Sequence, residues 1–132
     1  MKKVDVVAGV IFKNGKVLCV QRGNHKLEYV SNKFEFPGGK IQPNEAEQKA
    51  LQRELLEELN LNVVVGEKIM TVNHKYPDFE ICMQCYKCTT ESSNIELREH
   101  ISMRYMETKD LLELDWLEAD IPVVKYLMKD FK

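Results

Sequence analysis

The sequence predicts a mixed α/β fold (an α+β arrangement) in which helices cover the faces of a central sheet. Several runs rich in β-branched and aromatic residues are bounded by turn residues, as strands are. A segment in the first half of the chain and another at its end repeat apolar residues every three or four positions, as helices do. The length of 132 residues suits one core, so we expect a single domain over residues 1–132.

The composition excludes a general attraction to polyanions. Apolar residues make up 44% of the chain, charged residues 30%, and the net charge is −2. A polyanionic ligand would therefore need local cations or a metal ion. Asp5 and Lys13 interrupt the apolar start of the chain, and no segment has the roughly 18 apolar residues of a membrane span. We expect a cytoplasmic monomer or homodimer that binds neither membrane nor nucleic acid polymer.

The first part of the chain predicts three strands. Val4–Phe12 and Lys16–Gln21 are β-rich runs joined through an Asn-Gly pair, a strong hairpin signal. Residues 23–33 are polar and irregular, which is typical of a loop. Phe34–Phe36 is a short strand, and it ends at Pro37-Gly38-Gly39, where we expect a turn.

A helix is predicted to begin at Asn44 and to end near Leu59. Glu47 stands three residues after Asn44, which is a variant of the capping box. Leu51, Leu55 and Leu59 form an apolar stripe along one side. The next residue, Asn60, is expected in the left-handed conformation that ends many helices, a position usually taken by Gly and sometimes by Asn.

The second half of the chain predicts three more strands and two helices. Strands are expected over Val63–His74, Asp78–Thr89 and Ile101–Met106. A short helix over Lys109–Leu114 would be capped by Thr108, and the last helix would span Ile121–Met128.

Three of the four cysteines form a C-x-x-C-x-x-C run, which invites a metal-site interpretation. The run lies in a predicted strand, where successive side chains face opposite sides. Cys82 and Cys88 would then face one side and Cys85 the other, so one metal ion could hardly bind all three. We interpret them, with Cys19, as small buried hydrophobes in a reducing compartment.

Three glutamates lie close together on one face of the first predicted helix, in RELLEEL. Glu54, Glu57 and Glu58 stand three and four residues apart, where like charges repel by about 0.2–0.5 kcal/mol per pair. On its own this pattern is typical of a solvated helix face. The preceding Gly-Gly pair and Lys40 change that interpretation, because glycine lets backbone approach a ligand and hard cations prefer oxygen-rich sites. We therefore expect a site for Mg²⁺, with Mn²⁺ as an alternative.

The segment from Gly39 to Leu61 resembles the Nudix box, G-x5-E-x7-R-E-U-x-E-E-x-G-U, where U is a bulky aliphatic residue. Its glutamates, its arginine and its first glycine all match, and the last glycine is replaced by Asn60. FEFPGGKIQPNE, LREH and EADIPVV are similar to segments of the MutT-like branch, which includes oxidised-dGTP and CTP pyrophosphohydrolases. The resemblance covers nearly the whole chain.

This resemblance implies a Nudix-type α/β/α sandwich with a central mixed β-sheet. It also implies a Mg²⁺-dependent enzyme that hydrolyses nucleoside triphosphates, including those with oxidised bases, to the monophosphate and pyrophosphate. Sanitation of the nucleotide pool, and thereby DNA repair, would be its role. Three alternatives remain open: a Nudix hydrolase of another nucleoside diphosphate derivative, a non-catalytic nucleotide-binding Nudix module, and a structural domain.

Roles for single residues in the reaction follow from the same resemblance. Glu54, Glu57 and Glu58 would bind metal together with the backbone carbonyl of Gly38. Arg53 would orient the glutamates. Glu99, in LREH, corresponds to a further metal ligand or general base, and Glu57 is the other candidate base.

Four residues are implied in substrate binding. Arg22 and Lys40 correspond to phosphate-contacting positions, although both could be ordinary exposed cations. Asp120 corresponds to a residue that reads the base edge, although an Asp before Ile-Pro is also a good N-cap. An ionised Asp only accepts hydrogen bonds and suits an exocyclic amine such as that of cytosine, whereas a protonated Asp also donates and leaves oxidised guanine open. Phe36, like Tyr29 and Phe79, could stack on the base or belong to the core.

Overall fold

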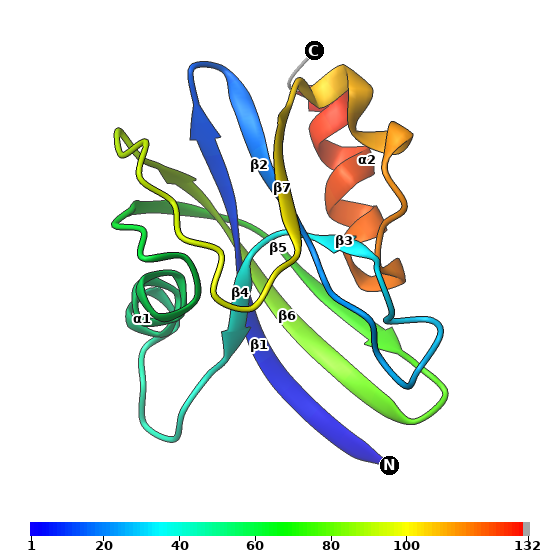
Figure 1. Ribbon diagram of the computed structural model, residues 1–132. Coiled ribbons are helices and arrows are strands. Elements are labelled where there is room, and N and C mark those ends of the chain that lie inside the picture. Colours follow the sequence, from blue (N-terminus) through cyan, green and yellow to red (C-terminus); the bar gives the residue numbers. More distant parts are fainter. Residues whose placement is uncertain (131–132) are drawn as a thin grey trace.

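The computed structural model describes residues 1–130, in which seven strands form one sheet with a helix on each side (Figure 1). Residues 131 and 132 of the predicted domain lie outside this part. In chain order the elements are β1 (Lys2–Lys13), β2 (Lys16–Gln21), β3 (Phe34–Glu35), β4 (Gly38–Lys40), α1 (Glu47–Leu59), β5 (Val64–Lys75), β6 (Phe79–Thr89), β7 (Ser102–Met106), the 3-10 turns η1 (Thr108–Glu113) and η2 (Glu118–Asp120), and α2 (Ile121–Asp130).

The sheet is mixed, as predicted. Its strand order is β3-β2-β1-β6-β5, with β4 also paired to β1 and β7 to β2. β1 runs parallel to β6 from the pair Lys2↔Phe79 to the pair Phe12↔Thr89, and the other pairings are antiparallel. On its other side β1 pairs first with β4 and further along with β2, so the sheet divides there. The candidate site lies beside this division.

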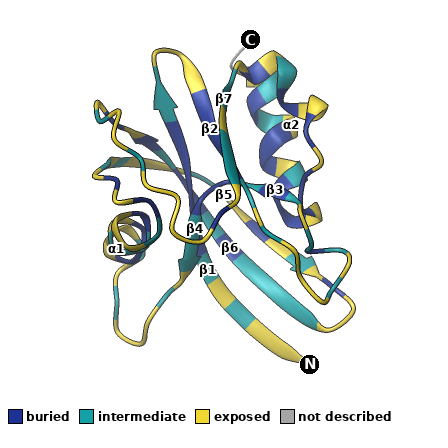
Figure 2. Ribbon diagram, viewed as in Figure 1, coloured by how far each residue is buried: buried dark blue, intermediate teal, exposed yellow. Residues whose placement is uncertain are grey.

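Two apolar layers hold the helices to opposite faces of the sheet. Successive residues of β1 face opposite sides, so Val7 and Ile11 pack with α1, while Ala8 and Val10 belong to the cluster of α2. The inner faces of both helices are buried and their outer faces exposed (Figure 2). This arrangement confirms the predicted α/β/α sandwich. No helix among residues 1–130 is long and apolar enough to cross a membrane.

The cysteines lie on both faces of the sheet, as the strand period predicts. Cys85 packs in the cluster of α2 and Cys88 in the cluster of α1, and all four cysteines are free. Cys82 is only partly buried, which differs from the prediction. Burial raises the pKa of both Cys19 and Cys88 to about 12, so these thiols stay protonated and unreactive at neutral pH.

The predicted start of the first helix is wrong. Asn44 has a φ of 64°, so it lies in a left-handed turn, whereas an N-cap needs extended backbone. Ala46 occupies the N-cap position without a side-chain hydrogen bond. The carboxylate of Glu47 accepts hydrogen bonds from Tyr86 (2.6 Å) and pairs with Lys68 (3.0 Å), so it ties α1 to the sheet.

The predicted Gly-Gly turn is also wrong, because Gly38 and Gly39 belong to β4. A Cβ atom on Gly38 would lie 2.0 Å from the carbonyl oxygen of Val7, so glycine is needed for this close pairing with β1.

The starts of two further helical segments also differ from the prediction. η1 is a 3-10 turn with Glu107, not Thr108, at its N-cap position, and Asp120 lies inside the helical turn η2, whose N-cap position belongs to Leu117.

The end of α1 agrees with the sequence. Asn60 is left-handed (φ 53°), its N–H donates to the carbonyl of Leu56 (3.0 Å), and the N–H of Leu61 donates to that of Leu55 (3.2 Å). A left-handed Asn is strained less than other L-residues but more than glycine.

Replacement of Asn60 by glycine and by alanine should therefore change the stability of the fold in opposite directions. We expect Asn60→Gly to raise the free energy of unfolding by roughly a few tenths of a kcal/mol and Asn60→Ala to lower it by roughly 1 kcal/mol. Urea denaturation of the two variants and the parent measures this. A lower midpoint for the glycine variant would contradict the explanation.

Candidate active site

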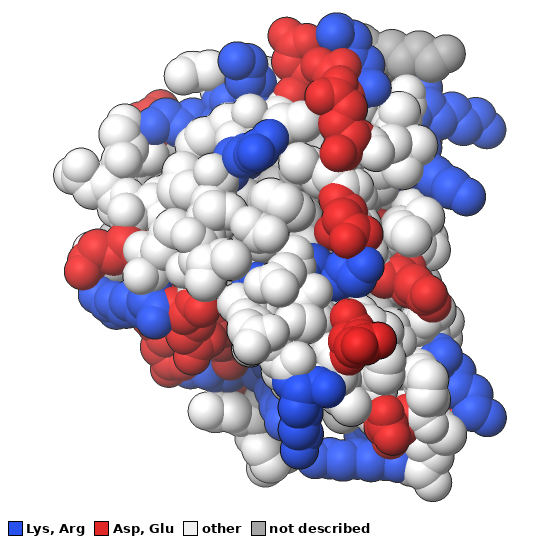
Figure 3. Space-filling view, turned by 45° about the vertical axis from the view of Figure 1, so that its right-hand side comes forward, with Lys and Arg blue, Asp and Glu red and all other residues white. Residues whose placement is uncertain are grey.

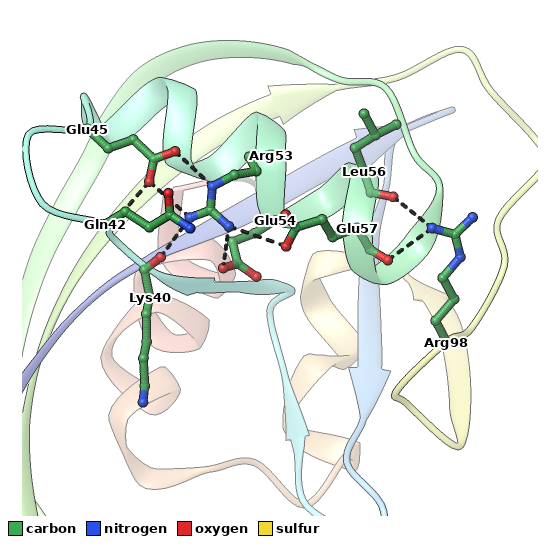
Figure 4. A network of polar contacts seen from close by, with 8 residues as sticks. All are labelled: Lys40, Gln42, Glu45, Arg53, Glu54, Leu56, Glu57 and Arg98. Atoms are coloured by element: carbon green, nitrogen blue, oxygen red, sulfur yellow. Dashed lines mark hydrogen bonds and ion pairs between the residues drawn. The ribbon is translucent and has the colours of Figure 1, made fainter.

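Arg53 joins the segments around the carboxylate cluster of α1 (Figure 4). Its guanidinium forms a two-point ion pair with Glu45 (2.8 and 2.9 Å) and reaches Glu54 at 3.0 Å and Glu57 at 3.3 Å. It also donates to the backbone carbonyl of Lys40 (3.0 Å), at the end of β4. Arg53 therefore fixes the helix, the turn before it and β4 relative to one another, and it contacts the glutamates as an orienting residue must.

Gly39 leaves the space that the Glu54 side chain occupies. A Cβ atom on Gly39 would lie 2.3 Å from Oε2 of Glu54, and this side chain is only 14% exposed. Burial raises the pKa of Glu54, although the neighbouring Arg53 acts in the opposite direction. A partly buried carboxylate with a cation on one side only is a suitable ligand for a second cation.

Glu58 has an unusual environment for a carboxylate. Among residues 1–130 its buried Oε2 has no hydrogen-bond partner, and the carboxyl group of Glu99 lies close to it in the same cleft. Burial, followed by the neighbouring Glu99, raises the pKa of Glu58 to about 9. Two acidic groups in such contact repel when both are ionised, so the site favours either a proton or a bound cation.

These groups line one cleft of about 440 Å³. Glu54 and Glu58 enter it from α1, Glu99 from the loop before β7, and Gly38, Gly39 and Lys40 from β4. Glu57 is not part of the lining. Its side chain is 59% exposed and points to Arg53, so the three glutamates of the predicted face have different environments.

The cleft offers some, but not all, of the ligands that a divalent cation needs. Within residues 1–130, no group of three or more Asp, Glu, His or Cys side chains is arranged so that it could hold a metal ion by itself. The orphaned oxygen of Glu58 and the space beside Gly39 nevertheless suit an oxygen-seeking ion. Mg²⁺ typically takes only one or two carboxylates and obtains its other ligands from water and substrate phosphates.

A second cavity of about 460 Å³ adjoins the cleft. Most of its walls are apolar and come from β1, β6 and the end of β3, and Asp120 lines it as a buried acidic group. Arg22, Glu35 and the three residues of β4 line both the cleft and this cavity. The two spaces therefore form one continuous site with an acidic part and an apolar part.

Asp120 is almost fully buried in the apolar part. Its Oδ2 accepts a hydrogen bond from the backbone N–H of Phe36 (3.2 Å). Burial, followed by the charge of Glu35, raises the pKa of Asp120 well above its ordinary value. Burial therefore shifts Asp120 toward its neutral form, and a neutral carboxyl group can donate as well as accept hydrogen bonds.

The three aromatic side chains considered for stacking differ in position. Phe36 and Phe79 line the apolar cavity, and Phe36 also packs on Trp116 with ring centroids 4.7 Å apart. Tyr29 is not part of the lining. It stacks on Tyr76, with centroids 5.3 Å apart and an interplanar angle of 16°, and its hydroxyl donates to Asp78.

Sequence reasoning missed Glu35 and His100. Oε2 of Glu35 pairs with Nε of Arg22 (3.1 Å) and with Nε2 of His100 (2.9 Å), so it links the predicted phosphate-binding arginine to the loop of Glu99. The alternation of FEF was an available signal, because Glu35 must face away from the side of its two aromatic neighbours. The partner His100 had no local signal, since 65 residues separate it from Glu35.

The chain matches the NUDIX domain family over residues 6–126. It belongs to this family. It is 30% identical to the CTP pyrophosphohydrolase of Escherichia coli, over 97% of this chain and 93% of that protein. It is 39% identical to the 8-oxo-dGTP diphosphatase of Buchnera aphidicola subsp. Schizaphis graminum, over 98% and 96% of the two chains. The solution structure of MutT from methicillin-resistant Staphylococcus aureus covers 98% of this chain and 99% of its own, with 37% identity and a TM-score of 0.75.

The family confirms the resemblance seen in the sequence, and the protein is a Nudix hydrolase with MutT-like relatives. On the face drawn in Figure 3, acidic and basic side chains are interspersed. Neither sign forms a continuous field on this face.

Glu58→Gln should make the metal-free protein more stable. Because the folded pKa of Glu58 is raised from 4.5 to about 9, folding takes up a proton between these values, and stability falls as pH rises through this range. Gln removes that loss, so we expect a gain on the order of 1 kcal/mol at pH 8, after allowance for solvent screening.

Denaturant unfolding with EDTA at pH 5 and pH 8 measures the effect. Glu57→Gln, an exposed position in the same helical turn, is the matched control and should change stability much less. An unchanged pH dependence in Glu58→Gln would show that the burial of this carboxylate has no energetic cost.

Proposed function

We propose that this Nudix hydrolase cleaves nucleoside triphosphates to the monophosphate and pyrophosphate, with Mg²⁺, and that its substrates are cytosine nucleotides or nucleotides with an oxidised base. The main support is the continuous site, in which an acidic cleft that fits a cation adjoins an apolar cavity with a buried acid. A nucleoside triphosphate has matching parts, with a polyanionic end and a flat heterocycle. The names of the E. coli and Buchnera relatives support both substrate classes.

Glu54, Glu58 and the carbonyl of Gly38 would hold the metal, with Glu99 and Glu57 as further ligands. Bound Mg²⁺ would supply charge neutralisation and Lewis-acid assistance to in-line displacement at phosphorus. Arg53 keeps Glu54 in place through its ion pair, and its remaining donors are bonded to Glu45 and to the backbone. Its role in this proposal is therefore to orient ligands without contacting the substrate.

Arg22 and Lys40 would bind the phosphates from the opposite side of the cleft. Arg22 is held through Nε by Glu35, and its side chain remains 44% exposed. The carbonyl of Lys40 is bonded to Arg53, while its ammonium group extends away from that network (Figure 4). A fixed guanidinium and a mobile ammonium suit a substrate whose charge shifts during the reaction.

Glu99 is the better candidate for the general base. It lines the cleft, whereas Glu57 lies outside the lining and pairs with Arg53. A base must reach the attacking water directly or through one further water. Glu99 meets this condition in the proposed arrangement, and Glu57 would have to leave its ion pair first.

Asp120 would read the base from the floor of the apolar cavity. As a neutral acid it presents one donor and further acceptor capacity, which matches the N3 and amino group of cytosine or the O6 and N1–H of an oxidised guanine. Phe36 and Phe79 would enclose the ring.

Removal of unwanted nucleotides from the precursor pool would be the cellular role, and the buried thiols suit a reducing cytoplasm. A hydrolase of another nucleoside diphosphate derivative is the second candidate, since the acidic cleft would serve it equally.

A substrate panel tests the proposed function. We expect CTP, dCTP or 8-oxo-dGTP to give the monophosphate and pyrophosphate with Mg²⁺, faster than ATP or dGTP, and no turnover in EDTA. Glu58→Gln should slow the reaction by orders of magnitude while it stays folded. Release of orthophosphate alone, or a rate indifferent to Mg²⁺, would exclude the mechanism.

Two substitutions test the protonated form of Asp120. Asn, like a neutral Asp, presents both a donor and an acceptor, so Asp120→Asn should keep most of the kcat/KM for the preferred nucleotide. Asp120→Leu should lower it roughly 10–100-fold, because the polar edge of the base loses its partner. Steady-state kinetics on both variants decides the matter, and an equal loss in both would indicate an ionised acceptor.

A further inference from the structure

The C-terminal end of α1 obtains most of its missing hydrogen bonds from another segment. The last four carbonyls of an α-helix have no partner inside the helix. In α1 the carbonyl of Leu56 accepts from Asn60, while those of Glu57, Glu58 and Leu59 are bonded to the loop before β7. This loop, residues 96–101, is therefore docked on the end of the helix.

Arg98 makes most of these contacts. Its guanidinium donates to the carbonyls of Glu57 (3.1 Å) and Leu56 (3.4 Å), and its own N–H donates to the carbonyl of Glu58 (3.2 Å). The N–H of Glu96 bonds the carbonyl of Leu59 (2.9 Å). Figure 4 shows the guanidinium beside the end of the helix, on the side away from Arg53.

The charge of Arg98 also suits this position. The C-terminal end of a helix carries a partial negative charge, and a cation near it stabilises the helix. α1, which the structure describes in full, has no basic residue in its last turn, and the exposed carboxylate of Glu57 adds negative charge there. Arg98 supplies from the loop the cation that the helix itself lacks.

Glu99 directly follows Arg98 and lines the same cleft as Glu58. On its other side the loop is held by His100, which contacts Glu35 (2.9 Å), and by the N–H of Ile101, which donates to the carbonyl of Gln21 (2.9 Å). Two anchors therefore flank Glu99, one on α1 and one on the sheet. These anchors fix the position of Glu99 beside Glu58, which matters because two carboxylates repel each other when both are ionised.

We propose that Arg98 is a positioning residue that holds Glu99 against Glu58 in the cleft by bonding the loop to the end of α1. This inference rests on the proposed function, in which Glu99 acts as base or metal ligand. Arg98 is not part of the cleft lining and contacts α1 only at backbone carbonyls, so we expect its effect on the reaction to pass through the position of Glu99.

Kinetics of a double-mutant cycle test this claim. The variants are Arg98→Ala, Arg98→Lys, Glu99→Gln and the double variant Arg98→Ala/Glu99→Gln. Arg104→Ala, which removes an exposed arginine of β7, is the control for loss of charge. We expect Arg98→Ala to lower kcat about 10–100-fold with little change in KM, because it acts on the geometry of a reacting group. Arg98→Lys should restore part of the rate.

Non-additivity is the decisive outcome. If Arg98 acts through Glu99, the double variant should be no slower than Glu99→Gln alone. Losses that multiply in the double variant would overturn the proposal, and so would an effect of Arg98→Ala no larger than that of Arg104→Ala.

Amide hydrogen exchange of the metal-free and substrate-free protein gives a readout that does not need activity. Arg98→Ala should speed exchange over residues 96–101, and Arg104→Ala should not. Unchanged protection in Arg98→Ala would overturn the positioning role even if turnover falls. Faster exchange in a protein that turns over no nucleoside triphosphate would instead refute the proposed function and leave the docking of the loop in place.

Discussion

The site depends on one constraint, which is that several carboxylates must stay close together with few cations among them. Arg53 compensates the charge of part of the cluster, because it bonds Glu45, Glu54 and Glu57. It also ties β4 to α1. Arg53 makes no contact of this kind with Glu58, whose buried oxygen has no hydrogen-bond partner within residues 1–130. The fold therefore neutralises one side of the cluster and leaves the other side to a proton or a ligand. This division separates the orienting part of the site from the binding part.

The division of the sheet at β1 gives the site its two connected spaces. The segment from Phe36 to Lys40 lies between them, because the N–H of Phe36 holds Asp120 in the apolar cavity while β4 faces the acidic cleft. The two glycines of β4 serve different needs, since Gly38 permits close pairing with Val7 and Gly39 leaves room for Glu54. A movement of this segment would alter both spaces together, so in the proposed function recognition of the base and binding of the phosphates would share one structural support.

Local signals predicted the features that depend on local structure. The hairpin, the end of α1 at Asn60 and the opposite faces of Cys85 and Cys88 follow from turn chemistry, capping and strand period, and all three are present. Features that depend on distant partners were not predictable in this way. Gly38 and Gly39 looked like a turn because their pairing with β1 is non-local, and helix geometry could not separate the exposed Glu57 from Glu58 because β4 and the loop of Glu99 decide which is buried. The link between Glu35 and His100 joins segments 65 residues apart.

Asp120 and Glu58 show two solutions to the burial of an acid. Asp120 lies deep among apolar walls, where burial favours the neutral form, and a neutral acid there remains useful as a donor for recognition. Glu58 lies at the wall of an open cleft, where its raised pKa means that a proton holds the place a cation would take. Metal binding must then displace this proton, so affinity for the ion and acidity of the site are linked. A cation bound in the cleft would relieve the repulsion that Glu54, Glu58 and Glu99 exert on one another when they are ionised.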